Sequence, residues 1–352
     1  MGPQQIESGQ IVNLFRHKTI TQEQFYDQLN KRQVVLVGET HDNVHHHKVQ
    51  LKIIKALHKR HKNIVIGLEM FPRHLQPILD RWVADELTRK DFLEAVDWDN
   101  IWGFDANLYM EILRFARDNQ VPLLAMNIKR EIVKEVRLKG VDGVDESIRH
   151  KLPKIAPASR EYTLILKDVF DSHPMMSKLG DFKNFVQAQQ VWDGVMATQI
   201  SEWLGHNPYG LVIGLTGSGH ISYGHGIPHQ LKSQGIDNIA TVLPWNIDQD
   251  WPDQTIAYYA WGVPKPPPPP VRFGIFLEDI DQEVYIKSVM EGSLAAKHGL
   301  KPEDEITHLN GQKITSSKRL VWLTKRLEWG TTAILDIVRE GEEIKIELDL
   351  ER

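Results

Sequence analysis

No cysteine occurs among the 352 residues of this chain. Its absence excludes disulfide bonds, thiolate metal ligands and a cysteine nucleophile, so any bound metal ion would have to be held by His, Asp, Glu or Tyr. Cysteine usage therefore gives no indication of the redox compartment. Histidine is abundant, with 16 residues, so imidazoles are available as ligands and as proton-transfer groups.

The chain also lacks an excess of positive charge and any long apolar run. Its formal net charge of −5 does not favour nucleic acid or an anionic membrane surface as a general partner. The first residues contain neither the basic nor the apolar region of an export signal, and no later segment is long enough to span a bilayer. We therefore expect a soluble chain, with a removed export signal as the alternative. A content of 41% hydrophobic and 25% charged residues is sufficient for two domains at this length.

Residues 34–37 form an apolar run that ends in a glycine, a carboxylate and an imidazole. Four aliphatic residues predict a buried strand, and Glu39 and His41 follow Gly38 at its carboxyl end. In open α/β sheets this end of a strand faces the ligand crevice, so the two titratable side chains suggest a functional site. The alternative is that they are the first polar residues of a surface loop.

Predicted strands and helices alternate along most of the chain. Helices are expected at residues 21–32, 43–61, 107–119, 129–139, 158–170 and 181–204, and further strands at 63–71, 121–127, 210–220, 239–243 and 256–261. This order predicts an α/β fold, with a mainly parallel sheet and helices on both faces. Parallel strands bring their carboxyl ends to one edge, where we expect Glu39, His41, Glu69, Asn127 and His220.

A lysine followed by five prolines at residues 265–270 predicts a stiff linker between a first domain, residues 1–264, and a second domain, residues 271–352. The second domain contains Gly-Ser-Leu-Ala-Ala-x-x-Gly-Leu-Lys-Pro-x-Asp-x-Ile-x-x-Leu-Asn-Gly and resembles a PDZ domain, which implies a small β-rich module. In that family a glycine-containing loop captures the C-terminal carboxylate of a partner protein, whose peptide adds a strand to an exposed edge. The resemblance maps this loop onto Phe273, Gly274, Ile275 and Phe276, with Phe276 in an apolar pocket. A degenerate module that packs only against the first domain is the alternative.

Two Gly-x-x-His sequences, residues 38–41 and 217–220, each close an apolar strand, and Glu69 ends another. In this order they resemble the ChaN-like branch of the haem-uptake and Tiki group over about residues 34–261. Two further stretches, within residues 97–102 and 187–197, are also similar to that branch. We therefore expect a pocket lined by Trp98, Trp102, Asn127, Gln189 and Asp193, although buried tryptophans are commonly core residues.

The resemblance implies a haem-binding protein that takes part in haem or iron uptake. The branch is associated with iron-regulated lipoproteins, in one of which a tyrosinate binds the iron. Haem iron accepts His or Tyr, and apolar walls hold the macrocycle. His41, His220 and Tyr223 are the candidates for this haem pocket. Tyr223 is favoured only because it follows His220 by three residues, and a structural tyrosine is the alternative.

The wider Tiki group includes metal-dependent proteases and hydrolases of the erythromycin-esterase type, which gives a second hypothesis. His41, His220 and one carboxylate could bind a divalent ion (Zn, Mn or Fe) and leave a position for water, whose pKa the metal lowers. Glu39 and Glu69 would then be the catalytic residues and divide the ligand and general-base roles, in an order that the sequence leaves open. Without a metal, a His and a Glu could activate water directly.

A third hypothesis is a scaffold in which the first domain is inactive and only the PDZ domain binds a partner. The family resemblance implies a periplasmic or outer-membrane-associated protein, and both a monomer and a homodimer stay open. Neither an export signal nor a lipid-attachment cysteine is present, so a cytoplasmic location stays open. The run His45-His46-His47 follows His41 at helical spacing, and we predict a solvated helix start there rather than a metal site.

Overall fold

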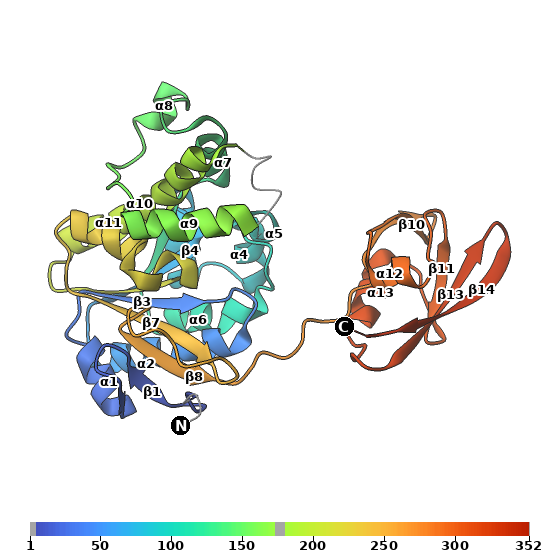
Figure 1. Ribbon diagram of the computed structural model, residues 1–352, viewed down its shortest axis with the longest axis horizontal. Helices are drawn as coiled ribbons and strands as arrows, with labels where there is room; N and C mark the ends of the chain where they lie inside the picture. Colours follow the sequence, from blue (N-terminus) through green and yellow to red (C-terminus); the bar gives the residue numbers. More distant parts are fainter. Residues whose placement is uncertain (1–4, 173–179, 352) are drawn as a thin grey trace. The chain divides into compact units, whose positions relative to one another are not determined.

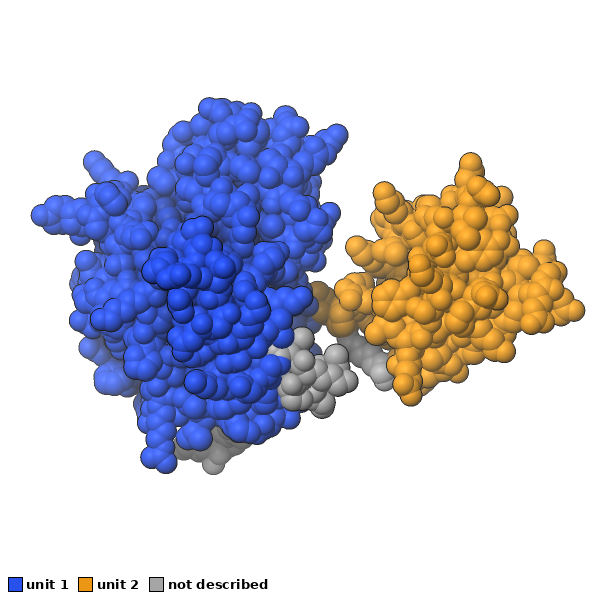
Figure 2. Space-filling model, turned by 90° about the horizontal axis from the view of Figure 1, so that it is seen from above, with its two compact units in different colours: residues 1–266 blue, residues 267–352 orange. Residues whose placement is uncertain are grey.

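The chain divides at the polyproline run into two compact units, Met1–Pro266 and Pro267–Arg352. The computed structural model describes residues 5–172 and 180–351. Each unit has its own core, and the two are coloured separately in Figure 2. No helix in the described ranges combines the length and the apolar character needed to cross a membrane.

An eight-stranded sheet forms the centre of the first unit, in the order β2-β1-β8-β7-β3-β6-β4-β5 (Figure 1). Neighbouring strands pair in parallel from β8 to β5, whereas β1 pairs antiparallel with both β8 and β2. The strands are β1 Ile11–Asn13, β2 Lys18–Ile20, β3 Val34–Glu39, β4 Ile64–Pro72, β5 Leu123–Asn127, β6 Leu211–Gly217, β7 Ile239–Asn246 and β8 Tyr259–Val263.

The helices begin at side chains that suit a helix N-terminus. Thr21 forms a capping box with Gln24, and the side chains of Asn43 and Asp181 cap α2 and α10. In this unit the helices are α1 Gln22–Leu29, α2 Val44–Arg60, α3 Gln76–Val83, α4 Arg89–Ala95, α5 Trp98–Ile101, α6 Asn107–Asp118, α7 Arg130–Lys139, α8 Glu146–Arg149, α9 Arg160–Ser172, α10 Phe182–His206 and α11 Ile227–Ser233.

Alternation along β3 explains how both faces of the sheet are covered. Val35 and Val37 belong to one core cluster, together with residues of α2, α3 and α6, whereas Val34 and Leu36 belong to another, together with residues of α10 and α11. All four valine and leucine side chains are fully buried. The predicted α/β fold, with a mainly parallel sheet between two helical layers, is therefore confirmed.

The second unit is a β-rich domain with two short helices, α12 Leu294–Lys297 and α13 Ser317–Thr324. Its antiparallel sheet has the order β14-β13-β11-β10-β9, and β12 pairs with β11. β9 forms one edge of this sheet, beside α13. The strands are β9 Ile275–Ile280, β10 Glu283–Val289, β11 Glu305–Leu309, β12 Gln312–Lys313, β13 Thr332–Arg339 and β14 Glu342–Asp349.

Candidate functional site

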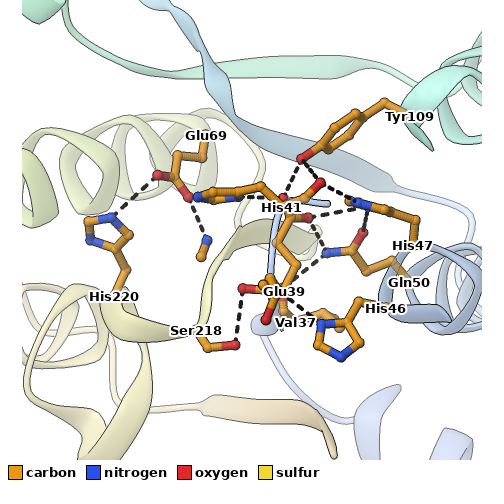
Figure 3. Close-up of polar contacts among 12 residues, drawn as sticks. Val37, Glu39, His41, His46, His47, Gln50, Glu69, Tyr109, Ser218 and His220 are labelled. Carbon is orange, nitrogen blue, oxygen red and sulfur yellow. Dashed lines mark hydrogen bonds and ion pairs between the residues drawn. The ribbon is translucent and has the colours of Figure 1, made fainter. Parts of the chain in front are cut away.

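The carboxyl ends of three adjacent strands, β3, β6 and β4, bring together four of the residues that the sequence singled out. Glu39 ends β3, Glu69 lies near the end of β4, and His220 follows β6 in a short 3-10 helix. His41 follows β3 and lies beside Glu69 in Figure 3. With Asp193 on α10, which contacts His220, these residues form what we call the carboxylate–imidazole cluster.

Glu39 holds one side of this cluster. Its carboxylate is buried and accepts hydrogen bonds from Tyr109 Oη at 2.6 Å, Gln50 Nε2 at 2.7 Å and His41 Nδ1 at 2.8 Å. Gln50 comes from α2 and Tyr109 from α6, so residues of two helices hold the Glu39 carboxylate in place at the end of β3 (Figure 3). The side chain of His41 is 28% exposed, and its imidazole is therefore both oriented and accessible.

The same contacts set the ionisation of this pair. Burial alone would raise the pKa of Glu39, but the His41 hydrogen bond and the nearby His47 lower it overall. Burial would lower the pKa of His41, but hydrogen bonding to Glu39 and the charge of Glu69 raise it. Glu39 therefore favours the protonated form of the His41 imidazole.

The other side of the cluster is a chain of buried contacts. Glu69 Oε2 accepts from the Gly217 N–H at 2.6 Å, and Glu69 Oε1 lies 3.3 Å from His220 Nε2. The opposite nitrogen, His220 Nδ1, lies 2.6 Å from Asp193 Oδ1, while Tyr162 Oη donates to Asp193 Oδ2 at 3.0 Å. The His220 imidazole is therefore held between two carboxylates.

Burial and charge oppose each other at this imidazole. Burial lowers the pKa of His220, yet Glu69 and Asp193 together raise it well above its ordinary value. The pKa of Glu69 is lowered by His220 in spite of burial, whereas burial leaves the pKa of Asp193 raised. The two carboxylates therefore favour the protonated form of the His220 imidazole, opposite in charge to Glu69.

The glycines of both Gly-x-x-His sequences are needed for close approach. A Cβ at Gly217 would stand 3.1 Å from His41 Cε1 and 3.7 Å from Glu69 Oε2. A Cβ at Gly38 would stand 2.6 Å from Leu243 Cδ2 and 2.8 Å from Ser218 Oγ. Hydrogen at these positions lets the His41 imidazole pack over β6 and lets the Ser218 segment pack against β3.

The expected pocket-lining residues have different roles. Trp102 is buried with its ring 4.6 Å from that of His41, whereas Trp98 packs in the core and donates to the Phe104 carbonyl. Asn127 Nδ2 donates to the Glu69 carbonyl at 2.8 Å and so fixes the end of β4. Gln189 is half-buried on α10, one turn before Asp193.

Sequence reasoning missed several residues that hold the cluster in place. Gln50 and Tyr109 carry polar atoms on the buried faces of α2 and α6. A polar residue on such a face needs a buried partner, and this was a signal that could have identified both residues. Tyr162 had no such signal, because its partner Asp193 becomes a neighbour only in the folded chain, whereas Trp192 lies within the stretch 187–197 that resembles the ChaN-like branch. The indole of Trp192 packs 5.1 Å from the His220 ring.

The prediction of a solvated histidine run at the start of α2 was wrong for two of its three residues. His46 and His47 are 4% and 3% exposed, because the first turn of α2 packs against the segment that follows β3. His46 Nδ1 accepts the Thr40 N–H at 2.9 Å, and burial lowers the pKa of His46 to about 4. Within the described residues, no group of three or more His, Asp or Glu side chains is arranged to hold a metal ion.

Tyr223 does not lie in the carboxylate–imidazole cluster. It lines a separate surface pocket of about 370 Å³, which we call the tyrosine pocket. Tyr223 is 39% exposed, its φ is +56°, and its N–H donates to the Ile256 carbonyl. The lining of the tyrosine pocket consists of Phe15, Tyr223, Gly224, Pro228, Lys232, Asp237, Ile239, Thr241, Gln254, Thr255, Ala257 and Tyr258.

A second pocket, of about 340 Å³, lies between β9 and α13 in the second unit and includes all four residues of the expected carboxylate loop. Gly274 has φ +77°, and a Cβ there would stand 2.3 Å from Ser293 Cβ. Phe273 is 3% exposed and belongs to the core, whereas Phe276 is 58% exposed at the pocket surface. Asp279 on β9 accepts hydrogen bonds from Ser317, the first residue of α13. The opposite end of this helix, next to Lys325, therefore lies toward the expected carboxylate loop and Arg272.

Comparison with known proteins finds a family match in each of the two units. The family model described as haem-binding uptake, Tiki superfamily, ChaN matches residues 25–231, and a PDZ model matches residues 271–350. A solved structure, titled as cofacial heme binding to ChaN of Campylobacter jejuni, superposes with a TM-score of 0.60. That structure is 21% identical and covers 72% of this chain and 98% of its own length, so it supports the fold.

Two curated proteases match shorter segments. The serine protease Do-like HtrA of Bacillus subtilis is 42% identical over 79 residues, which is 22% of this chain and 18% of that protein. The periplasmic serine endoprotease DegP of Salmonella typhimurium is 35% identical over 74 residues, 21% of this chain and 16% of that protein. This chain therefore spans less than a fifth of either relative. Because the first family model covers more than half of the chain, the protein belongs to the ChaN family of haem-binding uptake proteins in the Tiki superfamily, with a C-terminal PDZ domain.

Proposed function

We propose that this protein binds haem in the tyrosine pocket, with Tyr223 as the iron ligand, and that it takes part in haem uptake. The observation that carries the proposal is a half-exposed phenol in a largely apolar pocket. Haem iron accepts a tyrosinate, and its macrocycle needs apolar walls. Phe15, Pro228, Ile239 and Ala257 supply such walls around Tyr223.

The charged groups at this pocket also suit haem, which carries two carboxylates. Lys232 lines the pocket, and the guanidinium of Arg32 lies 5.3 Å from the ring centroid of Tyr258, at the same pocket. Both cations can pair with propionate groups. Asp237 is the carboxylate in the lining and marks the side from which propionates are repelled.

A volume of about 370 Å³ is at the lower end of ligand pockets, which run from about 300 to 1,000 Å³. A macrocycle seated there keeps one face partly open. Tyr258, Phe15 and Tyr223 are all exposed around the pocket, at 44%, 79% and 39%. A second haem-bearing copy of the chain can cover this apolar surface, an arrangement consistent with the cofacial haem named for the Campylobacter structure.

Haem titration of the purified chain tests this proposal. We expect a saturable Soret change, and Tyr223→Phe should weaken binding by at least about tenfold because it removes the ligand oxygen. Tyr209→Phe is the matched control, since Tyr209 is 88% exposed and lies outside the tyrosine pocket. Equal affinity of the Tyr223→Phe and Tyr209→Phe variants would overturn the assignment.

The carboxylate–imidazole cluster supports a second candidate function, hydrolysis with His41 as general base. Its imidazole is 28% exposed, is held by the buried Glu39 and faces Glu69, so it can take a proton from a bound water. His220 lies between two carboxylates and is less suited to this role.

An esterase assay with p-nitrophenyl acetate, together with peptide substrates, examines this candidate. His41→Gln should lower kcat/KM by at least about a hundredfold, while Tyr223→Phe should leave it unchanged. Activity should rise with pH through a value above the ordinary histidine pKa, because the base must be neutral and Glu39 raises the pKa of His41. Turnover that survives His41→Gln would exclude this role.

We also propose that the groove between β9 and α13 binds the C-terminus of a partner protein. The free edge of β9 offers backbone groups, Leu320 and Met290 line the groove, and Arg272 and Lys325 lie toward its loop end. Peptides with an apolar last residue should bind with a free carboxylate and lose affinity when amidated. Equal binding of the acid and amide forms to the full chain would contradict this proposal.

A further inference from the structure

Helix α13 carries a second feature, on the side opposite its buried residues. Leu320, Leu323 and Thr324 face the core, while Trp322 lies opposite to them and is 46% exposed. Four cations surround this indole along one face of the chain: Lys318, Arg319, Lys325 and Arg326. We call these five residues the α13 outer face.

Two guanidinium groups lie within cation–π distance of the indole. The Cζ atoms of Arg319 and Arg326 lie 4.7 Å and 3.2 Å from the Trp322 ring centroid. Arg326 also donates to the Trp322 carbonyl, and Arg319 donates to the Gln312 side chain. These contacts hold the indole close to two guanidinium groups at the protein surface.

The charges of this face are not neutralised within the domain. Among residues 5–172 and 180–351, none of the four cations forms an ion pair. Asp279, which contacts the start of α13, is engaged with the N–H and hydroxyl of Ser317. Carboxylates outnumber cations in residues 267–352, so this basic face stands apart from the rest of the domain.

We propose that the α13 outer face binds an anionic lipid surface. Lys and Arg side chains are attracted to anionic headgroups, and tryptophan prefers the interface between headgroups and acyl chains. A cationic face with a central indole suits an anionic lipid surface, and the peptide groove, lined by Leu320 and Thr324, meets this face only at Lys325.

Vesicle sedimentation with the full chain tests the proposal. We expect binding to phosphatidylcholine vesicles that contain one third phosphatidylglycerol, little binding to phosphatidylcholine alone, and release by added salt. Lys318→Gln, Arg319→Gln and Arg326→Gln in one chain should reduce partitioning by at least about tenfold. Trp322→Ser, which keeps all cations, should reduce it several-fold at constant salt dependence.

A matched control carries Lys287→Gln, Lys297→Gln and Lys345→Gln, which remove the same charge from exposed positions elsewhere in the domain. The control should retain partitioning within about threefold. An equal loss in both triple variants, or no binding to the anionic vesicles at low salt, would overturn the proposal. Binding of soluble polyglutamate in place of vesicles, lost only in the α13 variant, would also overturn it and would assign the face to an acidic protein partner.

Discussion

The carboxylate–imidazole cluster and the tyrosine pocket belong to the same domain but suit different ligands. In the cluster, Glu39, Glu69 and Asp193 are 3%, 2% and 0% exposed; Glu39 contacts His41, and the other two carboxylates share His220. In the tyrosine pocket, two phenols are about two-fifths exposed among apolar side chains. The first region has the buried charges typical of proton-transfer sites, and the second has the apolar walls that our haem proposal needs.

This difference separates candidate residues that the sequence had assigned to one pocket. The sequence placed His41, His220 and Tyr223 in one haem pocket, because Tyr223 follows His220 so closely. The left-handed backbone at Tyr223 turns the chain between them, and the phenol lines a pocket whose residues include neither imidazole. Variants of one region should therefore leave the other intact.

Glu69→Ala should give the largest effect and should be confined to the cluster. It leaves His220 Nε2 and the Gly217 N–H without a partner inside the protein, which should lower the free energy of unfolding by about 3–5 kcal/mol. Chemical denaturation measures this loss, and haem affinity of the folded fraction should be unchanged. Glu69→Gln, which can still accept from Gly217, should cost less, and a loss below about 1 kcal/mol for Glu69→Ala would contradict the ion pairing.

The second-largest difference between the two regions should be the pH dependence of the free energy of unfolding. The pKa of His220 is raised in the folded state, so protonation of its imidazole stabilises the fold. This stabilisation is complete below the unfolded-state pKa of about 6.5 and is lost as the pH rises through the folded-state pKa. Denaturation from pH 6 to pH 9 should therefore show a decline of about 1.4 kcal/mol for each unit of raised pKa. His220→Gln should flatten this decline, while Tyr223→Phe should preserve it.

Tyr162→Phe tests the outer end of the buried chain. Removing its hydroxyl leaves Asp193 Oδ2 without that donor, and unfolding should become easier by about 1–2 kcal/mol. Tyr223→Phe is the matched comparison, because the Tyr223 side chain is half-exposed and should change stability by less than about 0.5 kcal/mol. Similar losses in the two variants would remove the contrast between the regions.

Lys232→Gln should have the smallest effect, a several-fold decrease in haem affinity with no change in stability. An exposed cation at the pocket edge contributes only a modest, salt-dependent attraction to a propionate. Haem titration at low and high salt measures it. An equal decrease from Lys48→Gln, which is exposed on α2 outside the pocket, would show that only net charge matters.

The fold was largely predictable because its signals are local. Apolar runs and helical periods identified β3, β4, β5, β6 and α10, and parallel order alone placed Glu39, Glu69 and His220 at one edge. The three-residue strands β1 and β2 carry too short a pattern to detect, and the four-residue helix α5 is too short to show a helical period. These elements depend on tertiary packing rather than on local periodicity.

The site was less predictable where burial decides a side chain's role. His46 and His47 look solvated in sequence but pack behind β3, and Tyr162 reaches Asp193 from a different helix. Tyr223 carried no motif, and only the folded chain brings it beside Tyr258. Such residues are defined by contacts between distant segments, which no sequence period encodes.

The absorption spectrum of haem bound to Tyr223→His tests the central claim most directly. If Tyr223 is the iron ligand, this exchange should change the spectrum from that of a phenolate-bound iron to that of a histidine-bound iron. His41→Gln and His220→Gln should leave the wild-type spectrum unchanged. A spectrum that is unaffected by Tyr223→His but altered by either cluster variant would contradict the account and would place haem at the carboxylate–imidazole cluster.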